Sequence, residues 1–149
     1  MDLSPQDPSK RSGRSVASIF GFLTMLLSCY LFVSYDIVLG GIQFLTSWNW
    51  LSFYGVGQLS QNSIQLLLGI DGISAPMILL SGVVMFTGVL ISWNIKNRLK
   101  EYLVLYFLLI GGVFGVFVSY DLFFFFFFYE LSVLPMYLLV GVWGSSTDF

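Results

Sequence analysis

The stretch YLVLYFLLIGGVFGVFVSYDLFFFFFFYELSVLPMYLLVGVW, residues 102 to 143, decides the fold class of this chain. It holds two apolar runs on either side of a short turn, each long enough for a helix to cross a hydrocarbon core about 30 Å thick. The whole chain agrees with this, because 57% hydrophobic residues, 9% charged residues and a mean hydropathy of +0.88 are unlike ordinary soluble domains. The sequence therefore predicts an all-α integral membrane protein.

Two more uncharged apolar runs precede this stretch, so we predict four transmembrane helices. Glycines interrupt the long segment after the first helix, and Trp48 and Trp50 favour the headgroup level, so we expect an interfacial loop there instead of a fifth helix. The predicted boundaries are a polar N-terminal tail at 1–15, helices at 16–35, 73–93, 102–120 and 122–143, an outer-side loop at 36–72, a basic inner turn at 94–101, and a C-terminal tail at 144–149.

The basic residues predict the orientation of these helices. All six lie in two clusters, one before the first helix and one between the second and third helices: Lys10, Arg11, Arg14, Lys96, Arg98 and Lys100. Four helices place both clusters on the same side of the membrane. By the positive-inside rule, both termini then face the cytoplasm or the mitochondrial matrix.

The composition also argues against several kinds of site. Cys29 is the single cysteine and the chain has no histidine, so we expect no disulfide framework, no soft metal cluster and no Cys/His nucleophile. The net charge of −2 does not indicate a nucleic-acid partner. No residue pattern predicts a cofactor-binding or metal-binding site in this chain, and we expect no redox chemistry within it.

Most of the acidic residues fall in predicted tails or at membrane edges, where they are solvated. Asp71 and Asp121 stand at the outer starts of the second and fourth predicted helices, where a carboxylate caps free N–H groups and interacts favourably with the helix dipole. Helix capping is our interpretation for both residues, and a role in transport is the alternative.

Glu130 is different, because it lies about 12 Å inside the fourth predicted helix. A carboxylate at that depth costs about 2.5 to 3.5 kcal/mol on insertion scales, so it must face protein or water. Pro135 lacks an N–H, which frees the carbonyl of Leu131 and allows the helix to bend beside Glu130. The pattern is typical of a proton or ion site, and pairing with a basic residue of a neighbouring helix is the structural alternative.

Glycines in the second and third predicted helices indicate close helix approach. Gly111 and Gly115 form a small-xxx-small face with Gly112 beside it. Gly82 and Gly88 likewise leave room for a neighbouring helix to approach the second helix. Ordinary glycine content of membrane helices is the alternative explanation.

Four motifs of the sequence resemble one protein family: the Gly-Ile-Asp-Gly-Ile-Ser entry to the second helix, the Ser-Trp and Lys-Glu-Tyr of the basic turn, the Asp-Leu-x-x-Phe start of the fourth helix, and Glu-x-x-x-x-Pro-Met-Tyr followed by Gly-x-Trp-Gly. Together they cover residues 69 to 145. In order and spacing they resemble the antiporter-like chain 4 of mitochondrial NADH:ubiquinone oxidoreductase, called subunit M in bacterial complex I.

The resemblance implies a module of the proton-pumping membrane arm, in which Glu130 matches a glutamate that pairs with a lysine on a later, broken helix. NADH, FMN, iron–sulfur clusters and ubiquinone would be bound by other subunits of the complex. The family has about fourteen helices, and counterparts of its first helix and of those beyond the fifth are absent here. We therefore expect a fragment of a split subunit, whose partners are the remaining fragment with that lysine, neighbouring membrane-arm subunits and lipid.

Three functions remain open at this point. The first is an N-terminal fragment of the proton-pumping subunit, acting as part of a proton-translocating NADH:ubiquinone reductase. The second is a subunit of a multi-subunit sodium/proton antiporter, and the third is a structural membrane scaffold. We expect the mitochondrial inner membrane with both termini on the matrix side, and a bacterial plasma membrane or a thylakoid is the alternative.

Overall fold

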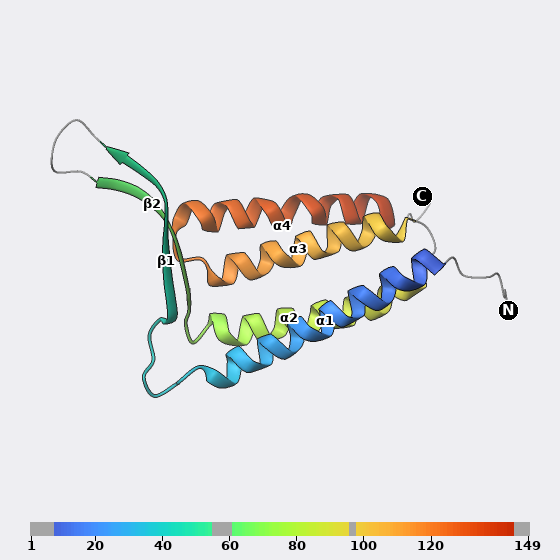
Figure 1. Cartoon of the computed structure of the whole chain (residues 1–149), viewed down its shortest axis with the longest axis horizontal. Coiled ribbons are helices and arrows are strands. Elements are labelled where there is room, and N and C mark those ends of the chain that lie inside the picture. The colour runs from blue at the N-terminus through green and yellow to red at the C-terminus, as the bar shows by residue number, and fades with distance from the viewer. Residues whose placement is uncertain (1–7, 55–60, 96–97, 145–149) are drawn as a thin grey trace.

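The computed structural model describes residues 8–54, 61–95 and 98–144 (Figure 1). It contains four long helices and one two-stranded antiparallel sheet. The elements are α1 (Pro8–Ser34), β1 (Gln43–Tyr54), β2 (Gln61–Ile70), α2 (Ser74–Ile91), the 3₁₀ turn η1 (Ser92–Asn94), α3 (Leu99–Val118) and α4 (Leu122–Trp143). All four helices are long and apolar enough to cross a membrane, which confirms the predicted fold class.

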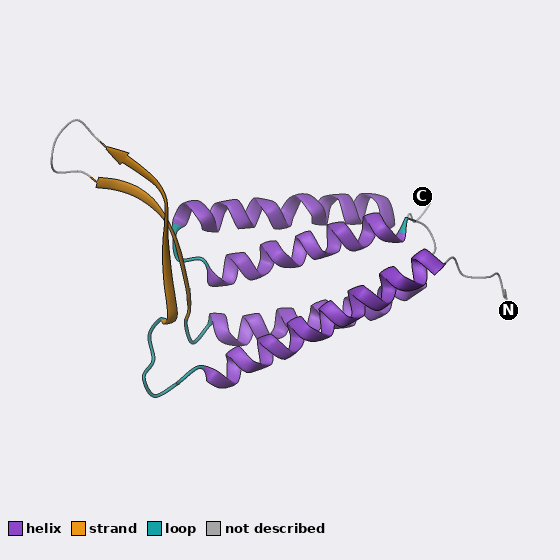
Figure 2. Ribbon diagram, in the orientation of Figure 1, coloured by secondary structure: helices purple, strands orange, loops and turns teal. Residues whose placement is uncertain are grey.

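The helices form two pairs that lie side by side (Figures 1 and 2). One pair is α1 with α2, the other is α3 with α4, and a smaller contact between α2 and α3 joins them. Both ends of the described chain lie at one end of the bundle, and the strands lie at the other end.

Small residues allow α1 and α2 to approach closely. Ser28 of α1 lies against Gly82 of α2, where an added Cβ would stand 2.8 Å from the Ser28 Cβ. Ala17 packs in the same interface with Val89, which is fully buried. The hydroxyl of Ser28 is satisfied within its own helix, since it donates to the Thr24 carbonyl.

The α3 and α4 interface also depends on glycine, as the sequence predicts. A Cβ on Gly112 would stand 2.8 Å from the Ser132 backbone nitrogen, and one on Gly115 would overlap the Phe128 ring. Gly111 differs, because nothing lies within 4 Å of its Cβ position. The close-approach face is therefore Gly112 and Gly115, which are three residues apart and share one side of the helix.

Tyr106 joins the two helix pairs. It is 8% exposed, and its hydroxyl donates to the carbonyls of Val84 and Met85 at 3.1 and 3.3 Å. Its ring lies against Gly88, and a Cβ there would overlap the phenol oxygen. The glycine therefore makes room for a hydrogen-bonded tyrosine between α2 and α3.

The predicted starts of two helices, α1 and α3, are wrong. Residues 8–15 continue α1 into the basic region instead of belonging to a tail. Pro8 fits the first helical position because its fixed φ suits the helix and its missing N–H has no intrahelical role there. The basic turn is also shorter than predicted, since α3 begins at Leu99. Residues 1–7, 96–97 and 145–149 lie outside the described residues.

The segment 36–72 is not an irregular loop, because β1 and β2 pair within it. Trp48 pairs with Leu66 and Thr46 with Leu68. Tryptophan favours strands as well as membrane interfaces, and the sequence prediction used only its preference for the interface. We call this pair of strands the hairpin.

The hairpin is attached to the turn between α3 and α4. The Tyr120 N–H donates to the Leu67 carbonyl at 2.8 Å, and Ser119 forms an isolated bridge with Leu68. The hairpin thus covers one end of the bundle, next to the start of α4 (Figure 1).

The opposite end of the bundle carries the basic residues. Arg14 donates to the Ile95 carbonyl at 3.2 Å, and the Trp93 indole N–H donates to the Ser18 hydroxyl at 3.2 Å. Arg98 lies 3.8 Å from Glu101 on the surface. We call this end, which holds Arg11, Arg14, Arg98 and Lys100, the basic end.

Candidate functional site

Glu130 lies on the face of α4 that points away from α3. On α4, Phe128 and Ser132 lie against glycines of α3 and Pro135 is buried, whereas Glu130 is exposed. At about 100° per residue, Glu130 is about 160° from Ser132 around the helix. The helix pair therefore presents the carboxylate outward, away from the described bundle.

The surface around Glu130 is apolar. Phe126 and Leu134, four residues before and after it, are 63% and 61% exposed, and Tyr137 is 77% exposed. Residues at this spacing lie on the same side of a helix as Glu130. This face, which we call the Glu130 face, holds one charge in a wide apolar surface.

Within the described part of the chain, no hydrogen bond or ion pair reaches the Glu130 carboxylate, and the single described salt bridge is Arg98 with Glu101 at the basic end. A carboxylate within a membrane requires a partner or water. The Glu130 face therefore needs a group from outside these residues.

The backbone of α4 is perturbed on both sides of this carboxylate. The Ser132 hydroxyl donates to the Tyr129 carbonyl at 2.7 Å, and Pro135 interrupts the ladder of N–H donors inside the helix. The carbonyl of Leu131 consequently has no donor at residue 135. Pro135 itself is fully buried, so its ring packs into the bundle while the freed carbonyl lies one residue from Glu130.

Asp121 stands at the start of α4 and accepts from the Phe124 N–H at 3.4 Å. Asp71 stands three residues before α2, where its Oδ1 accepts from the N–H groups of Ile73 and Ser74 at 3.1 and 2.6 Å. Both arrangements satisfy free donors at a helix start, which is what a capping carboxylate does.

The carboxylate of Asp71 is held in its ionised form. The Ser74 N–H, followed by the Ser74 hydroxyl, lowers the pKa of Asp71 below its ordinary value of 3.8. Nearby, burial first and the negative charge of Asp71 second raise the pKa of Tyr120. The Tyr120 hydroxyl is buried, and its interaction with the Asp71 side chain lowers the pKa of Asp71 and raises its own.

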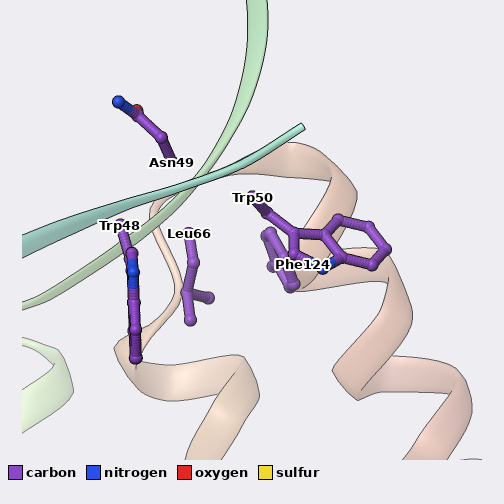
Figure 3. A pocket seen from close by; sticks show the side chains of 5 residues that line it. All are labelled: Trp48, Asn49, Trp50, Leu66 and Phe124. Atoms are coloured by element: carbon purple, nitrogen blue, oxygen red, sulfur yellow. The ribbon is translucent and has the colours of Figure 1, made fainter. Parts of the chain in front are cut away.

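An aromatic pocket of about 300 Å³ lies between the hairpin and α4 (Figure 3). Trp50 packs on Phe123 and Phe124 with ring centroids 5.7 and 5.5 Å apart. Asn49 points to the other side of the strand, away from these rings. The contact closes the hairpin over the first turn of α4, about two turns before Glu130.

The described residues contain no group of three or more His, Cys, Asp or Glu side chains that would hold a metal ion. Asp71 and Asp121 cap the starts of α2 and α4, Glu130 lies inside α4, and Cys29 is a free thiol in α1. The candidate site that remains is the Glu130 face, together with the nearby helix backbone that Pro135 perturbs.

No family model matches the chain. Among curated proteins, it is 34% identical over 94% of its length to NADH-quinone oxidoreductase subunit M of Pseudomonas aeruginosa. It is also 34% identical over 94% of its length to NAD(P)H-quinone oxidoreductase chain 4 3 of a Picosynechococcus species, and 34% identical over 89% to NADH-ubiquinone oxidoreductase chain 4 of Chondrus crispus. The chain is a homologue of subunit M, or chain 4, of these oxidoreductases.

The homology covers only part of the relatives. The chain spans 28%, 24% and 25% of the length of these three proteins. As a homologue of subunit M, it accounts for about a quarter of such a subunit, which agrees with the outward, unpartnered Glu130 face.

Sequence reasoning named Glu130 and Pro135, whose roles stay predictions, and it predicted the capping contacts that Asp71 and Asp121 make. It missed Tyr106 and the contact of Trp50 with α4. Alternation in Trp48-Asn49-Trp50 was the available signal for a strand with one aromatic face. No pattern in the sequence around Tyr106 pointed to its role, because its partners are backbone carbonyls in another helix.

Proposed function

We propose that this chain forms part of the proton-translocating subunit M of a respiratory NADH-quinone oxidoreductase, and that Glu130 carries protons within it. The observation that carries the proposal is a single carboxylate about 12 Å inside a transmembrane helix, presented outward on an apolar face. Homology to subunit M and chain 4 proteins supports the proposal that the chain belongs to this kind of complex.

The Glu130 face would pack against helices that lie outside these 149 residues. A lysine or arginine on such a helix would favour the charged carboxylate, while removal from water would favour the neutral acid. The affinity of Glu130 for a proton would then change whenever the partner moves or changes its own proton occupancy. That coupling is what a proton pump requires.

The reaction itself belongs to the complex. NADH oxidation and quinone reduction would occur on FMN, iron–sulfur clusters and the quinone site of other subunits, and this chain would add no redox group. We place the chain in the mitochondrial inner membrane, with the basic end on the matrix side by the positive-inside rule. A bacterial plasma membrane would give the same orientation relative to the cytoplasm.

Glu130→Gln tests the proposal because it removes the charge and keeps the shape and hydrogen-bonding capacity. We expect the complex to assemble normally on a native gel, and proton uptake by energised membrane vesicles to fall severalfold. Glu101→Gln at the basic end is the matched control and should pump normally. Intact assembly with undiminished proton uptake in Glu130→Gln would reject Glu130 as a proton carrier.

The two alternatives give different results. A sodium/proton antiporter subunit would purify without flavin and iron–sulfur subunits, whereas the proposed subunit purifies with them. A structural scaffold would lose assembly, and not pumping alone, in Glu130→Gln.

A further inference from the structure

A second feature of the molecule lies far from Glu130, at the basic end. An apolar groove of about 780 Å³ runs between α1 and α3, from Gly13 and Lys100 at one end to Phe20 and Leu108 at the other. This volume falls within the range of about 300 to 1,000 Å³ that is common for small-molecule sites.

The polarity of the groove changes along its length. Lys100, at the mouth, is the only charged residue among those that line it, and Val104 and Leu108 follow one and two turns further along α3. The one acid of α3, Glu101, lies 3.8 Å from Arg98. No described ion pair involves Lys100. The mouth is therefore cationic, and everything beyond it is apolar.

The length of the groove corresponds to one leaflet of a bilayer. Eight residues separate Lys100 from Leu108, which is about 12 Å of helix, and half of a hydrocarbon core is about 15 Å. Further from the basic end, Leu31 of α1 and Phe117 of α3 both pack on the buried cluster around Ile78, so the chain's own side chains fill the interface there.

We propose that this groove binds an anionic phospholipid, with its phosphate beside Lys100 and an acyl chain along Val104 toward Leu108. Basic residues at the membrane surface attract anionic headgroups, and basic pockets between transmembrane helices hold them. A transmembrane helix is a poorer occupant, because it needs a groove through both leaflets.

The test uses membranes that contain the complete complex and a phosphatidylglycerol probe with a photoreactive group in its acyl chain. A phosphatidylcholine probe with the same acyl chain is the control for headgroup charge. We expect the anionic probe to label peptides within residues 13–20 and 100–108 about fivefold more than the zwitterionic probe, as one basic residue at the surface implies.

Two substitutions separate headgroup recognition from acyl-chain packing. Lys100→Gln should lower labelling by the anionic probe to the level of the zwitterionic probe, and Arg98→Gln, at the same end but outside the groove, should not. Val104→Trp fills the groove and should abolish labelling by both probes, whereas Ile91→Trp on the exposed side of α2 should not. Lys100 and Val104 are exposed, so neither change removes a buried contact.

Equal labelling by the two probes, unaffected by Lys100→Gln, would mean ordinary surrounding lipid and would overturn the proposal. Cross-links from groove residues to another polypeptide, without lipid labelling, would show that a protein helix fills the groove and would overturn it equally. Neither result bears on Glu130, so failure of the lipid proposal would leave the proposed function untouched. The proposed function is tested separately by Glu130→Gln.

Discussion

Gly112 of α3 lies directly against Ser132 of α4, so that a Cβ on the glycine would stand 2.8 Å from the serine backbone nitrogen. This contact sets the separation of the two helices, and on the far side of α4 it turns Glu130 outward. Packing on one face of α4 and the charge on the other are therefore linked.

Gly112→Leu should separate α3 from α4, because the added side chain meets backbone that cannot move aside. Overpacking of this kind costs about 1 to 3 kcal/mol. We expect less assembled complex on native gels and faster thermal inactivation. Gly111→Leu is the matched control, since its Cβ position is open, and equal behaviour of the two variants would refute the role of this contact.

Gly88→Ala should displace the Tyr106 hydroxyl from between α2 and α3. Tyr106→Phe alone should cost about 0.5 to 1.5 kcal/mol through the lost hydrogen bonds to the Val84 and Met85 carbonyls. Because Tyr106→Phe also removes the atom that Gly88→Ala strikes, the double variant should cost less than the sum of the two. Additive effects on the thermal stability of the complex would mean that the two residues act independently.

Asp71→Ala should destabilise the start of α2 by about 0.5 to 2 kcal/mol, since the N–H groups of Ile73 and Ser74 lose their acceptor. The pKa of Asp71 is lowered in the folded state, so this stabilisation is present above the ordinary value of 3.8 and disappears as the pH falls through the lower folded value. Between pH 6 and 8 the deficit in thermal stability should therefore be constant. A deficit that grows or shrinks across that range would contradict the capping role, and Asp71→Asn should recover part of the loss.

The sequence predicted the four helices because each is a long apolar run, and it placed α4 at 122–143 as the structure has it. It also predicted close helix approach, but it paired Gly111 with Gly115, whereas the structure uses Gly112. Spacing alone does not reveal which side of a helix faces its partner. Likewise, Trp50 is an aromatic residue at a membrane edge by composition, and its contact with Phe124 depends on the hairpin register.

Trp50→Ala should release the hairpin from α4, because its two ring contacts each contribute about 0.5 to 1.5 kcal/mol beyond the buried area. We expect faster proteolysis within residues 43–70 in membranes opened to that side. Trp50→Phe keeps an aromatic ring at the site and should be close to the natural protein. Unchanged proteolysis in Trp50→Ala would show that Tyr120 and Ser119 hold the hairpin without the tryptophan.

Pro135→Ala should restore an N–H donor to the Leu131 carbonyl and stiffen α4 beside Glu130. Alanine suits this test because Pro135 is fully buried, and a larger residue would add a packing defect. If polar backbone next to Glu130 helps to admit water, proton uptake in energised vesicles should fall, though less than in Glu130→Gln, with normal assembly. Pro76→Ala is the matched control, because Pro76 lies in the first turn of α2 where its N–H would have no helical partner anyway. Hydrogen exchange of the amides in residues 128–139 should slow in Pro135→Ala alone. If exchange slows and proton uptake is unchanged, the proline shapes the helix without any part in proton transfer.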